Sequence, residues 1–473
     1  MTDSGGRLRL ITFSCIGASA AVLLLLALAP PAAAQVQAAA PDTTDADSLS
    51  RRYIAWLRQH AFPIRTEDPT DEHFSDLQRL KPMLAGVRII GLGEQTHGTR
   101  EFFRMKHRLL SFLVREMGVR TFALEASQTR CEAINDYVEG KSADGAAALA
   151  GQGFWMWDTE EVRALVDWMR AYNATVGPTD RVRFVGIDYQ YRRKSEAALL
   201  AYLRRVAPAR VASVDSLFQR TPEWFPIFLS NDSATKAQAW QRISAASAGH
   251  LELLGFLVLN ERELVRLSSA TEYQEQLHHA RLLTQYTHWP SETGPSRDYA
   301  MAENLARIVD ADSSGARVVL WAHNYHVAVN AGEGTTGYHL RRMYGTGYMA
   351  LGFALGHGSF QSYDLDAKPR PALAQFTIPP ASEGTVDWHL ARVGFERYIV
   401  DLRDVAPEPV ATWLATPQPM RSFGTIYSAN WPESEQVYRR VLRPGYDGLL
   451  FIRQTTRARP NRPSPTSPPP AAR

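Results

Sequence analysis

The sequence has few cysteines and lacks the short motifs of several common enzyme classes. It contains only two cysteines, Cys15 and Cys131, in 473 residues. We expect Cys15 to be removed with an N-terminal segment, so that no intramolecular disulfide can form. Cys-x-x-Cys, His-Glu-x-x-His and Gly-x-Ser-x-Gly patterns are all missing. These absences argue against a disulfide scaffold, a zincin-type protease and a serine hydrolase with a nucleophile elbow.

The chain also lacks a strong charge of one sign. Its 52 lysines and arginines against 49 aspartates and glutamates give a net charge of +3. That value is too small for the basic field on which nucleic-acid binding depends, so we expect no nucleic-acid partner. With 45% hydrophobic and 21% charged residues, the chain can bury a large core. It is therefore predicted to be globular rather than disordered or coiled-coil.

Long apolar runs are confined to the N-terminus. Only the run at 11–29 approaches the roughly 20 residues that span a bilayer. Arg7 and Arg9 precede it, and the small residues Ala32–Ala34 follow it. This order is typical of a signal peptide at residues 1–34, which predicts export to the periplasm or the medium and no stable membrane span after cleavage. An uncleaved membrane anchor is the alternative.

Short apolar runs along the rest of the chain predict a parallel-rich sheet. The runs 87–93 and 119–127 flank a helical pattern at 101–117, an arrangement typical of a parallel βαβ unit. Similar runs follow at 182–190, 316–324, 348–356, 397–402 and 447–452. Because these runs are apolar on both faces, we expect strands that are covered by helices on both sides. The predicted fold class is α/β, a parallel-rich central sheet flanked by helices, with an inserted helical lobe.

Composition also predicts the order of the segments. Long helical patterns interrupt the strand runs after Arg192. The last 20 residues contain six prolines, a composition that buries too little surface to fold. The predicted segments are a signal peptide (1–34), a flexible mature N-terminus (35–50), an α/β core (51–191 and 308–452), a helical lobe (192–307) and a disordered Pro/Arg-rich tail (453–473).

Polar side chains follow four of the predicted strands. They are Glu94, His97, Glu125, Asp188 and His323. Ligands bind beyond the carboxyl ends of parallel strands, so we expect these side chains to meet at one rim of the sheet. Histidines and carboxylates brought together in this way indicate hydrolytic chemistry. A turn-capping role is the alternative for Asp188.

The loop 93–100 is the most informative of these segments. A nucleotide loop is not favoured, because Thr96 stands where the third glycine of a dinucleotide motif would be and no Gly-Lys-Ser/Thr follows. A structural role for His97 is possible in principle, but the loop opens a helix, where free backbone N–H groups attract anions. We interpret it as functional. Trp155 and Trp157 are predicted to wall a pocket for a large apolar ligand.

The stretch GLGEQTHGTREFFRMKHRLLSFLVREMGVRTFALEAS resembles the signature of the erythromycin esterase family. WMWDTEEVRALVDWMRAYN, FVGIDYQ, RDYAMAEN, WAHNYHV and GYHLRRMYGTGYMALGF are similar to its later blocks, in the same order. The resemblance covers about residues 50–452. It implies an α/β core with a helical lobe and the water-dependent opening of a macrolide lactone or a related ester, with a small-molecule substrate.

The resemblance also implies roles for individual residues. His97 is the expected general base, with Glu94 beside it and Glu125 and His323 as further catalytic residues. The resemblance also implies that Arg100 and Lys106 contribute to the site, and we expect both to bind substrate. From their places in the sequence we expect the same of Trp155, Trp157, Asp188 and His326. A neutral imidazole can accept a proton from water near pH 7, which fits this reaction.

Two other functions remain open from the sequence. Two histidines and two glutamates could hold a divalent ion, as is thought for Tiki-type relatives, which would make the protein a metal-dependent hydrolase. The fold could also serve a non-catalytic binding protein of the envelope, since some relatives are labelled succinoglycan biosynthesis proteins. No cofactor is expected, although a divalent metal is not excluded.

Overall fold

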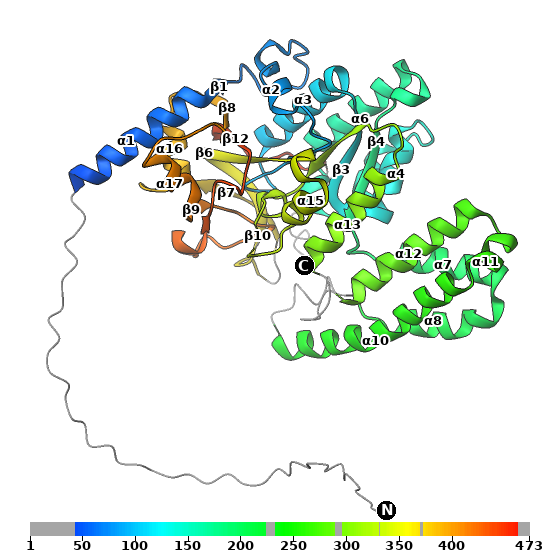
Figure 1. The fold of residues 1–473 in the computed structure, drawn as a ribbon. Coiled ribbons are helices and arrows are strands. Elements are labelled where there is room, and N and C mark those ends of the chain that lie inside the picture. The colour runs from blue at the N-terminus through cyan, green and yellow to red at the C-terminus, as the bar shows by residue number, and fades with distance from the viewer. Residues whose placement is uncertain (1–42, 224–231, 289–295, 331, 369–371, 462–473) are drawn as a thin grey trace, which may run out of the picture. The chain divides into compact units, whose positions relative to one another are not determined.

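The computed structural model describes residues 43–223, 232–288, 296–330, 332–368 and 372–461 (Figure 1). The chain divides into two units, Met1–Ala46 and Asp47–Arg473. The fold described below is that of the second unit. The expected signal peptide, and the segment after it as far as residue 42, lie outside the described residues.

The centre of the fold is a mixed sheet of ten strands with the order β1-β8-β12-β6-β2-β5-β3-β4, to which β7 and β10 add beside β6. The strands are β1 (Ala61–Pro63), β2 (Ile89–Leu92), β3 (Val119–Ser127), β4 (Arg183–Asp188), β5 (Arg317–Trp321), β6 (Tyr348–Asp364), β7 (Ala372–Ile378), β8 (Arg397–Asp401), β10 (Ile426–Tyr427) and β12 (Gly448–Thr455). β9 (Gln418–Arg421) and β11 (Val437–Arg440) form a small separate sheet.

Most strand pairs are parallel. β12, β6, β2, β5, β3 and β4 run in one direction, whereas β8 is antiparallel to β12, β1 to β8, and β7 to β6. β2 and β3 are parallel as predicted, and β5 lies between them. The predicted fold class is therefore confirmed.

Helices cover both faces of this sheet. One face is covered by α2 (Leu80–Met83), α3 (Arg100–Met117), α4 (Gln128–Val138), α5 (Gly145–Gly151) and α6 (Glu160–Thr175). The other is covered by α1 (Thr43–His60), α13 (Arg297–Asp310), α14 (Asn324–Val327), α15 (Thr336–Tyr344), α16 (Val386–Ala391) and α17 (Val410–Ala415). Neighbouring residues such as Ile89 and Ile90 join opposite clusters, which explains why the strand sequences are apolar at successive positions.

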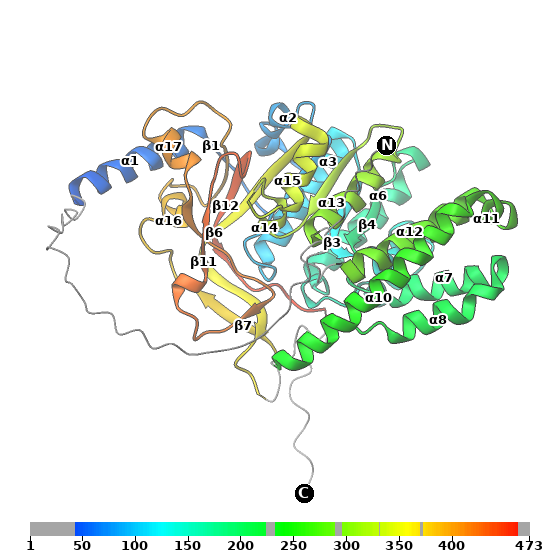
Figure 2. The ribbon, with the colours of Figure 1, turned by 60° about the horizontal axis from the view of Figure 1, so that its bottom comes forward.

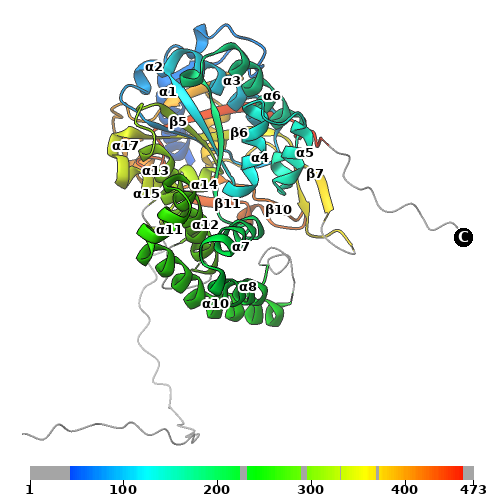
Figure 3. The same ribbon diagram turned by 90° about the vertical axis from the view of Figure 1, so that its right-hand side faces the viewer.

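The described α-helices of the lobe are α7 (Arg193–Val206), α8 (Val211–Arg220), α10 (Ser233–Leu259), α11 (Glu261–Leu267) and α12 (Ala270–His288). Figures 2 and 3 show these helices side by side, and they share a hydrophobic cluster of their own. α10 is long and apolar enough to cross a membrane by length and composition alone, which the sequence analysis did not anticipate. Its buried Leu253 and Leu257 pack within the lobe cluster.

The helical lobe ends earlier in the chain than the sequence predicted. α13 was expected within the lobe up to residue 307, but its Met301 and Leu305 are buried against the sheet residues Val318 and Ala350. The helical pattern alone could not show this, because a helix that covers a sheet and a lobe helix have the same periodicity. The lobe therefore ends before α13.

Both terminal boundaries also change. α1 begins at Thr43, inside the segment predicted to be flexible. At the other end β12 continues to Thr455, and the backbone of Ala458 donates a hydrogen bond to the carbonyl of Gly98 at 2.8 Å. The predicted disordered tail from residue 453 is therefore wrong for residues 453–461. Composition indicated disorder there, but backbone pairing to another segment orders the chain.

Candidate active site

Glu94 and His97 form a close pair in the loop after β2. His97 Nδ1 donates to Glu94 Oε1 at 2.6 Å. Glu94 Oε2 accepts hydrogen bonds from Lys106 Nζ and Trp321 Nε1, each at 2.6 Å. The carboxylate is thus held on both oxygens, and the proton on Nδ1 leaves the Nε2 lone pair of His97 available as a base.

Lys106 lies beneath this pair, on α3. Its side chain is fully buried, with Nζ 4.3 Å from the ring centre of Trp321 and 5.1 Å from that of Phe353. Burial lowers the pKa of Lys106 to about 8, and the carboxylate of Glu94 opposes this shift. In this conformation the ammonium group binds Glu94 and does not reach the surface, so the substrate contact of Lys106 stays a prediction.

A second cluster surrounds Glu125 at the end of β3. Glu125 Oε1 accepts from Arg297 Nη2 at 3.0 Å and lies 3.1 Å from His326 Nε2, and Oε2 accepts from the backbone N–H of His323 at 2.9 Å. Burial favours a raised pKa for Glu125, but His326 and Arg297 outweigh it and hold the pKa well below its ordinary value. Glu125 is therefore a permanent carboxylate that orients its neighbours.

His326 is enclosed by two carboxylates. Its Nε2 faces Glu125, and its Nδ1 donates to Asp298 Oδ1 at 2.8 Å. Burial alone would lower the pKa of His326, but Glu125 and Asp298 raise it to about 10. The two carboxylates therefore favour the charged form of the ring, although Arg297 Nη1 lies 3.2 Å from the same Nε2.

Asp188 is the last residue of β4, and its side chain is buried. Its carboxylate accepts from Arg297 Nη2 at 2.7 Å and from the backbone of Tyr189 at 2.7 Å, and the side chain is fully buried. These donors occupy the carboxylate in this conformation, and the substrate contact of Asp188 stays a prediction. Asp188 instead holds the guanidinium that binds Glu125.

His323 stands beside the predicted base. The ring centres of His97 and His323 are 5.0 Å apart. His323 Nδ1 accepts from the backbone N–H of Tyr325 at 3.2 Å, and its Nε2 is 3.4 Å from the carbonyl oxygen of Gln95. Burial lowers the pKa of His323 to about 3, with His97 adding to the shift. His323 is therefore neutral. Its Nε2–H makes only the long 3.4 Å contact with the carbonyl of Gln95, so it can donate a hydrogen bond to another group beside His97.

The two tryptophans differ in position. Trp157 is fully buried, lies edge-on to His97 at 5.7 Å between ring centres, and donates to the carbonyl of Glu125 at 3.1 Å. In this conformation the indole contacts the ring of His97 and is not exposed, so its role as a pocket wall stays a prediction. Trp155 is only partly buried and lies 6.0 Å from the ring of Tyr363, so it can still meet a ligand.

Arg100 lies at the first turn of α3 and pairs with Glu161 at 3.4 Å, about a third exposed. No contact with the histidines is present among the described residues, so its substrate role stays a prediction.

Sequence reasoning missed Arg297, Asp298 and Gln95. The first two lie in the RDYAMAEN block at the start of α13, where the resemblance was the only signal. Gln95 donates to Asp387 at 2.5 Å and accepts from the backbone of Leu355 at 2.9 Å, which fixes the loop between Glu94 and His97. No local pattern predicts such long-range partners.

The donor groups fit a metal ion poorly. Within the described ranges no group of three or more histidine, cysteine, aspartate or glutamate side chains is arranged to hold one. The oxygens of Glu94 and Glu125 are already bound to Lys106, Arg297 and His326, whose positive charges would repel a divalent cation. The carboxylates of Glu94 and Glu125 instead pair with cationic side chains of the protein.

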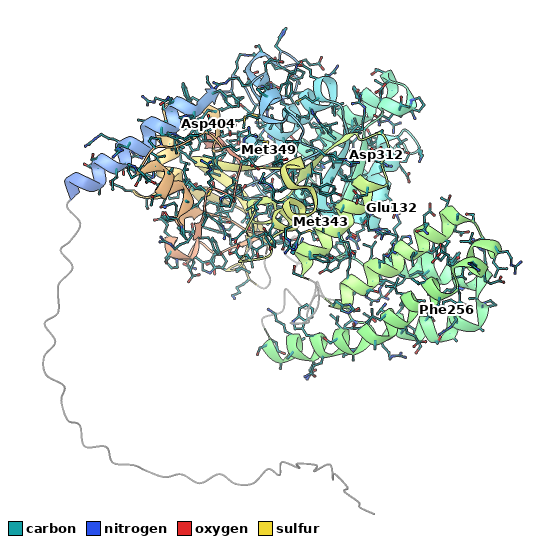
Figure 4. The ribbon with its side chains drawn as sticks, viewed as in Figure 1. Glu132, Phe256, Asp312, Met343, Met349 and Asp404 are labelled. Atoms are coloured by element: carbon teal, nitrogen blue, oxygen red, sulfur yellow. The ribbon has the colours of Figure 1, made fainter. Side chains whose placement is uncertain are left out.

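A cavity of about 650 Å³ lies along β4, away from His97. It is lined by residues of α4, β4, α12 and α13, including Gln128, Glu132, Arg183, His278 and Arg307. Figure 4 labels Glu132 on this side of the core and Phe256 in the lobe. Neither His97 nor Glu94 lines the cavity. The polar cluster, rather than this cavity, therefore defines the candidate site.

The fold is that of a family whose members are named as hydrolytic enzymes. The profile of the erythromycin esterase family matches residues 114–455, and the chain belongs to this family. Glu125 and His323 lie inside the matched range, whereas Glu94 and His97 precede it. The names of the family and of its relatives support hydrolase activity in general.

Two curated relatives span nearly the whole chain. Erythromycin esterase type II of Escherichia coli is 22% identical over 447 residues, which cover 86% of this chain and 98% of that protein. The putative hydrolase YbfO of Bacillus subtilis is 23% identical over 443 residues, covering 87% and 93%.

Three solved structures share the fold. A Bacillus cereus protein superposes with a TM-score of 0.71 at 24% identity, covering 87% of this chain and 99% of that one. A succinoglycan biosynthesis protein gives 0.69 at 21%, covering 87% and 99%. A mutant of the erythromycin esterase EreC in its open conformation gives 0.60 at 18%, covering 84% and 98%.

Proposed function

We propose that this protein hydrolyses a carboxylic ester, with a macrolide lactone as the leading substrate class, by general-base activation of water at His97. The observation that carries the proposal is the 2.6 Å hydrogen bond from His97 Nδ1 to Glu94, which fixes the tautomer that has a basic Nε2. Glu94 is itself anchored by two further donors. General-base assistance of this kind contributes roughly 10² to 10⁴ in rate.

The reaction uses the neighbouring groups in a defined order. Nε2 of His97 takes a proton from water as the water oxygen bonds to the ester carbonyl carbon, and Glu94 stabilises the imidazolium. The Nε2–H of His323, weakly held by Gln95, donates to the developing oxyanion. The C–O bond then breaks, and the imidazolium returns its proton to the leaving alkoxide. Trp157 keeps the His97 ring in place through its edge-on contact.

Access to the base limits which ester can react in this conformation. His97 is only 5% exposed and Glu125 only 8%. A macrolide ring would need the rim to open before it reached Nε2 of His97. The related EreC has been solved in an open conformation. The proposal for macrolides rests on the family name together with the partly exposed Trp155.

Mass spectrometry of purified protein with macrolides and with simple aryl and alkyl esters tests the reaction. A ring-opened macrolide, heavier than the intact compound by one water, supports macrolide lactones as the substrate class. Cleavage of simple esters alone indicates an esterase whose site does not admit a macrolide. If no compound is hydrolysed, the proposed function fails.

We also propose that the reaction needs no metal or other cofactor, because the carboxylates already bind protein cations. Export remains part of the proposal. It rests on the arginine-flanked apolar run at 11–29 and the following Ala32–Ala34. An N-terminus near Gln35 in protein recovered from cells supports export, and an intact Met1 in a membrane fraction contradicts it.

A further inference from the structure

Six residues after β12, Thr456–Asn461, form a strap that runs beyond the range matched by the family profile. The strap makes one antiparallel bridge at Thr99 and another at Thr159, the residues that precede α3 and α6. The first N–H groups of a helix have no partner within the helix. The strap supplies carbonyl oxygens to both of these helix starts.

At the start of α3 the strap holds the residues next to His97. Thr456 O accepts from the N–H of Arg100 at 2.9 Å, and the N–H of Ala458 donates to Gly98 O at 2.8 Å. Both oxygens of the Glu101 side chain accept from Thr456, from its N–H and its hydroxyl, each at 2.6 Å. Because Gly98 directly follows His97, these contacts fix the end of the loop that carries the base.

At the start of α6 the same strap holds the residues next to Trp157. Arg459 O accepts from the N–H of Glu160 at 2.7 Å, and the N–H of Asn461 donates to Asp158 O at 3.1 Å. The amide of Asn461 also donates to Asp158 Oδ1 at 2.9 Å. Asp158 directly follows Trp157, the ring that meets His97 edge-on.

The loop is seated tightly between the strap and β6. Gly98 O accepts from Gln361 N at 3.1 Å as well as from Ala458, and a Cβ atom built on Gly98 would lie 2.0 Å from Gln361 O. Ala458 is fully buried at this point. Glycine is therefore required at 98 for the backbone of the loop to approach β6 this closely.

We propose that the strap is a positioning element of the catalytic site, which sets the His97 loop against the Trp157 turn. The inference rests on the proposed function of His97. Without the strap, the Gly98 carbonyl loses one donor and the N–H groups of Arg100 and Glu160 lose their acceptors. The two segments can then move apart, and a displacement of about 1 Å at a catalytic group can cost on the order of 10² in rate.

Two truncations test the proposal. One form ends at Thr455 and lacks the strap, and the matched control ends at Asn461 and retains it. We expect the Thr455 form to lose about 10-fold to 100-fold in kcat, with KM nearly unchanged, because none of the residues predicted to bind substrate lies in the strap. The control should match the full chain. Wild-type kcat in the Thr455 form would overturn the proposal.

Hydrogen exchange separates this inference from the proposed function. Amides of 97–101 and 158–161 should exchange faster in the Thr455 form than in the Asn461 form. If their exchange is unchanged, the strap inference is wrong whatever the activity. If exchange is faster but the Thr455 form keeps the wild-type kcat, the strap holds the loop without serving catalysis and the strap inference is wrong. A wild-type kcat in His97→Asn, with a lower kcat in the Thr455 form, contradicts the proposed role of His97 and not the strap.

A pair of point variants covers the case in which the Thr455 form does not fold. Ala458→Pro removes the N–H that donates to Gly98 O, whereas Ala458→Gly keeps this N–H and removes only the Cβ methyl group. Lower kcat and faster loop exchange in Ala458→Pro alone support the proposal. Equal kcat and exchange in the two variants contradict it.

Discussion

Raising the pH above about 8 should lower kcat, because Lys106 then loses its proton. This ammonium group is fully buried, holds Glu94 Oε2 at 2.6 Å, and has its pKa lowered to about 8 by burial, against the effect of Glu94. Above that pH Lys106 becomes neutral and Glu94 loses its cation. If the neutral form is inactive, kcat should fall about tenfold for each pH unit above about 8.

The deprotonation of Lys106 should lower activity without destabilising the fold. Its pKa is about 8 in the folded protein against an ordinary value of 10.5. Between these values the unfolded chain binds more protons, so the contribution of Lys106 to the free energy of unfolding rises with pH. Activity and this contribution to stability therefore change in opposite directions.

The assay is the pH profile of kcat from pH 6 to 10 in the wild type and in Lys106→Met, with the fold of each monitored by circular dichroism. Lys106→Met has no titrating group at this position and leaves Glu94 buried without its cation, a loss that typically costs about 3 to 5 kcal/mol in stability. We expect Lys106→Met to have a lower kcat than the wild type, and we expect this kcat not to fall as the pH rises through 8. A folded Lys106→Met protein that keeps the wild-type alkaline limb would refute the reasoning.

Three further predictions follow from the geometry. Burial lowers the pKa of His107 and His250 to about 4 and that of His278 to about 3, so these rings stay neutral in the fold while the unfolded chain takes up protons below about 6.5. The free energy of unfolding, measured in urea, should therefore fall by roughly 1 kcal/mol per pH unit for each such histidine between pH 6.5 and about 4, and a constant value would contradict this. Hydrolysis should survive EDTA, and activity that is lost and then restored by zinc or manganese would favour the metal-dependent alternative. Trp155→Ala should raise KM with little change in kcat, since the partly exposed indole only binds substrate, and a selective loss of kcat would assign it another role.

The sheet could be predicted because its strands are buried on both faces. Ile89 and Ile90 face opposite clusters, so every position of the strand is apolar and the run is recognisable. The strand-end rule likewise predicted that Glu94, Glu125 and His323 would come together. The structure brings these side chains and His97 to one rim, although their chemical roles remain predictions.

The parts that sequence reasoning missed depend on partners far apart in the chain. Lys106 is one of many polar residues on a helix, and only the buried Glu94 turns it into a positioning group. Arg297 lies more than 100 residues after Glu125 and Asp188 in the sequence, with the lobe between them, and only the fold brings it to their carboxylates. The strap was assigned to the tail because its composition resembles a disordered segment, whereas its contacts are mostly made by the backbone, which composition does not describe.

The most direct test of the central claim is kcat of His97→Asn on the ester or macrolide that the protein hydrolyses. Asparagine keeps an N–H donor near Nδ1 for Glu94 and removes the basic Nε2, so the fold and Tm should be retained. The account predicts that kcat falls by at least about 10², the lower end of the contribution of a general base. A folded His97→Asn protein that turns over substrate at the wild-type rate would contradict it.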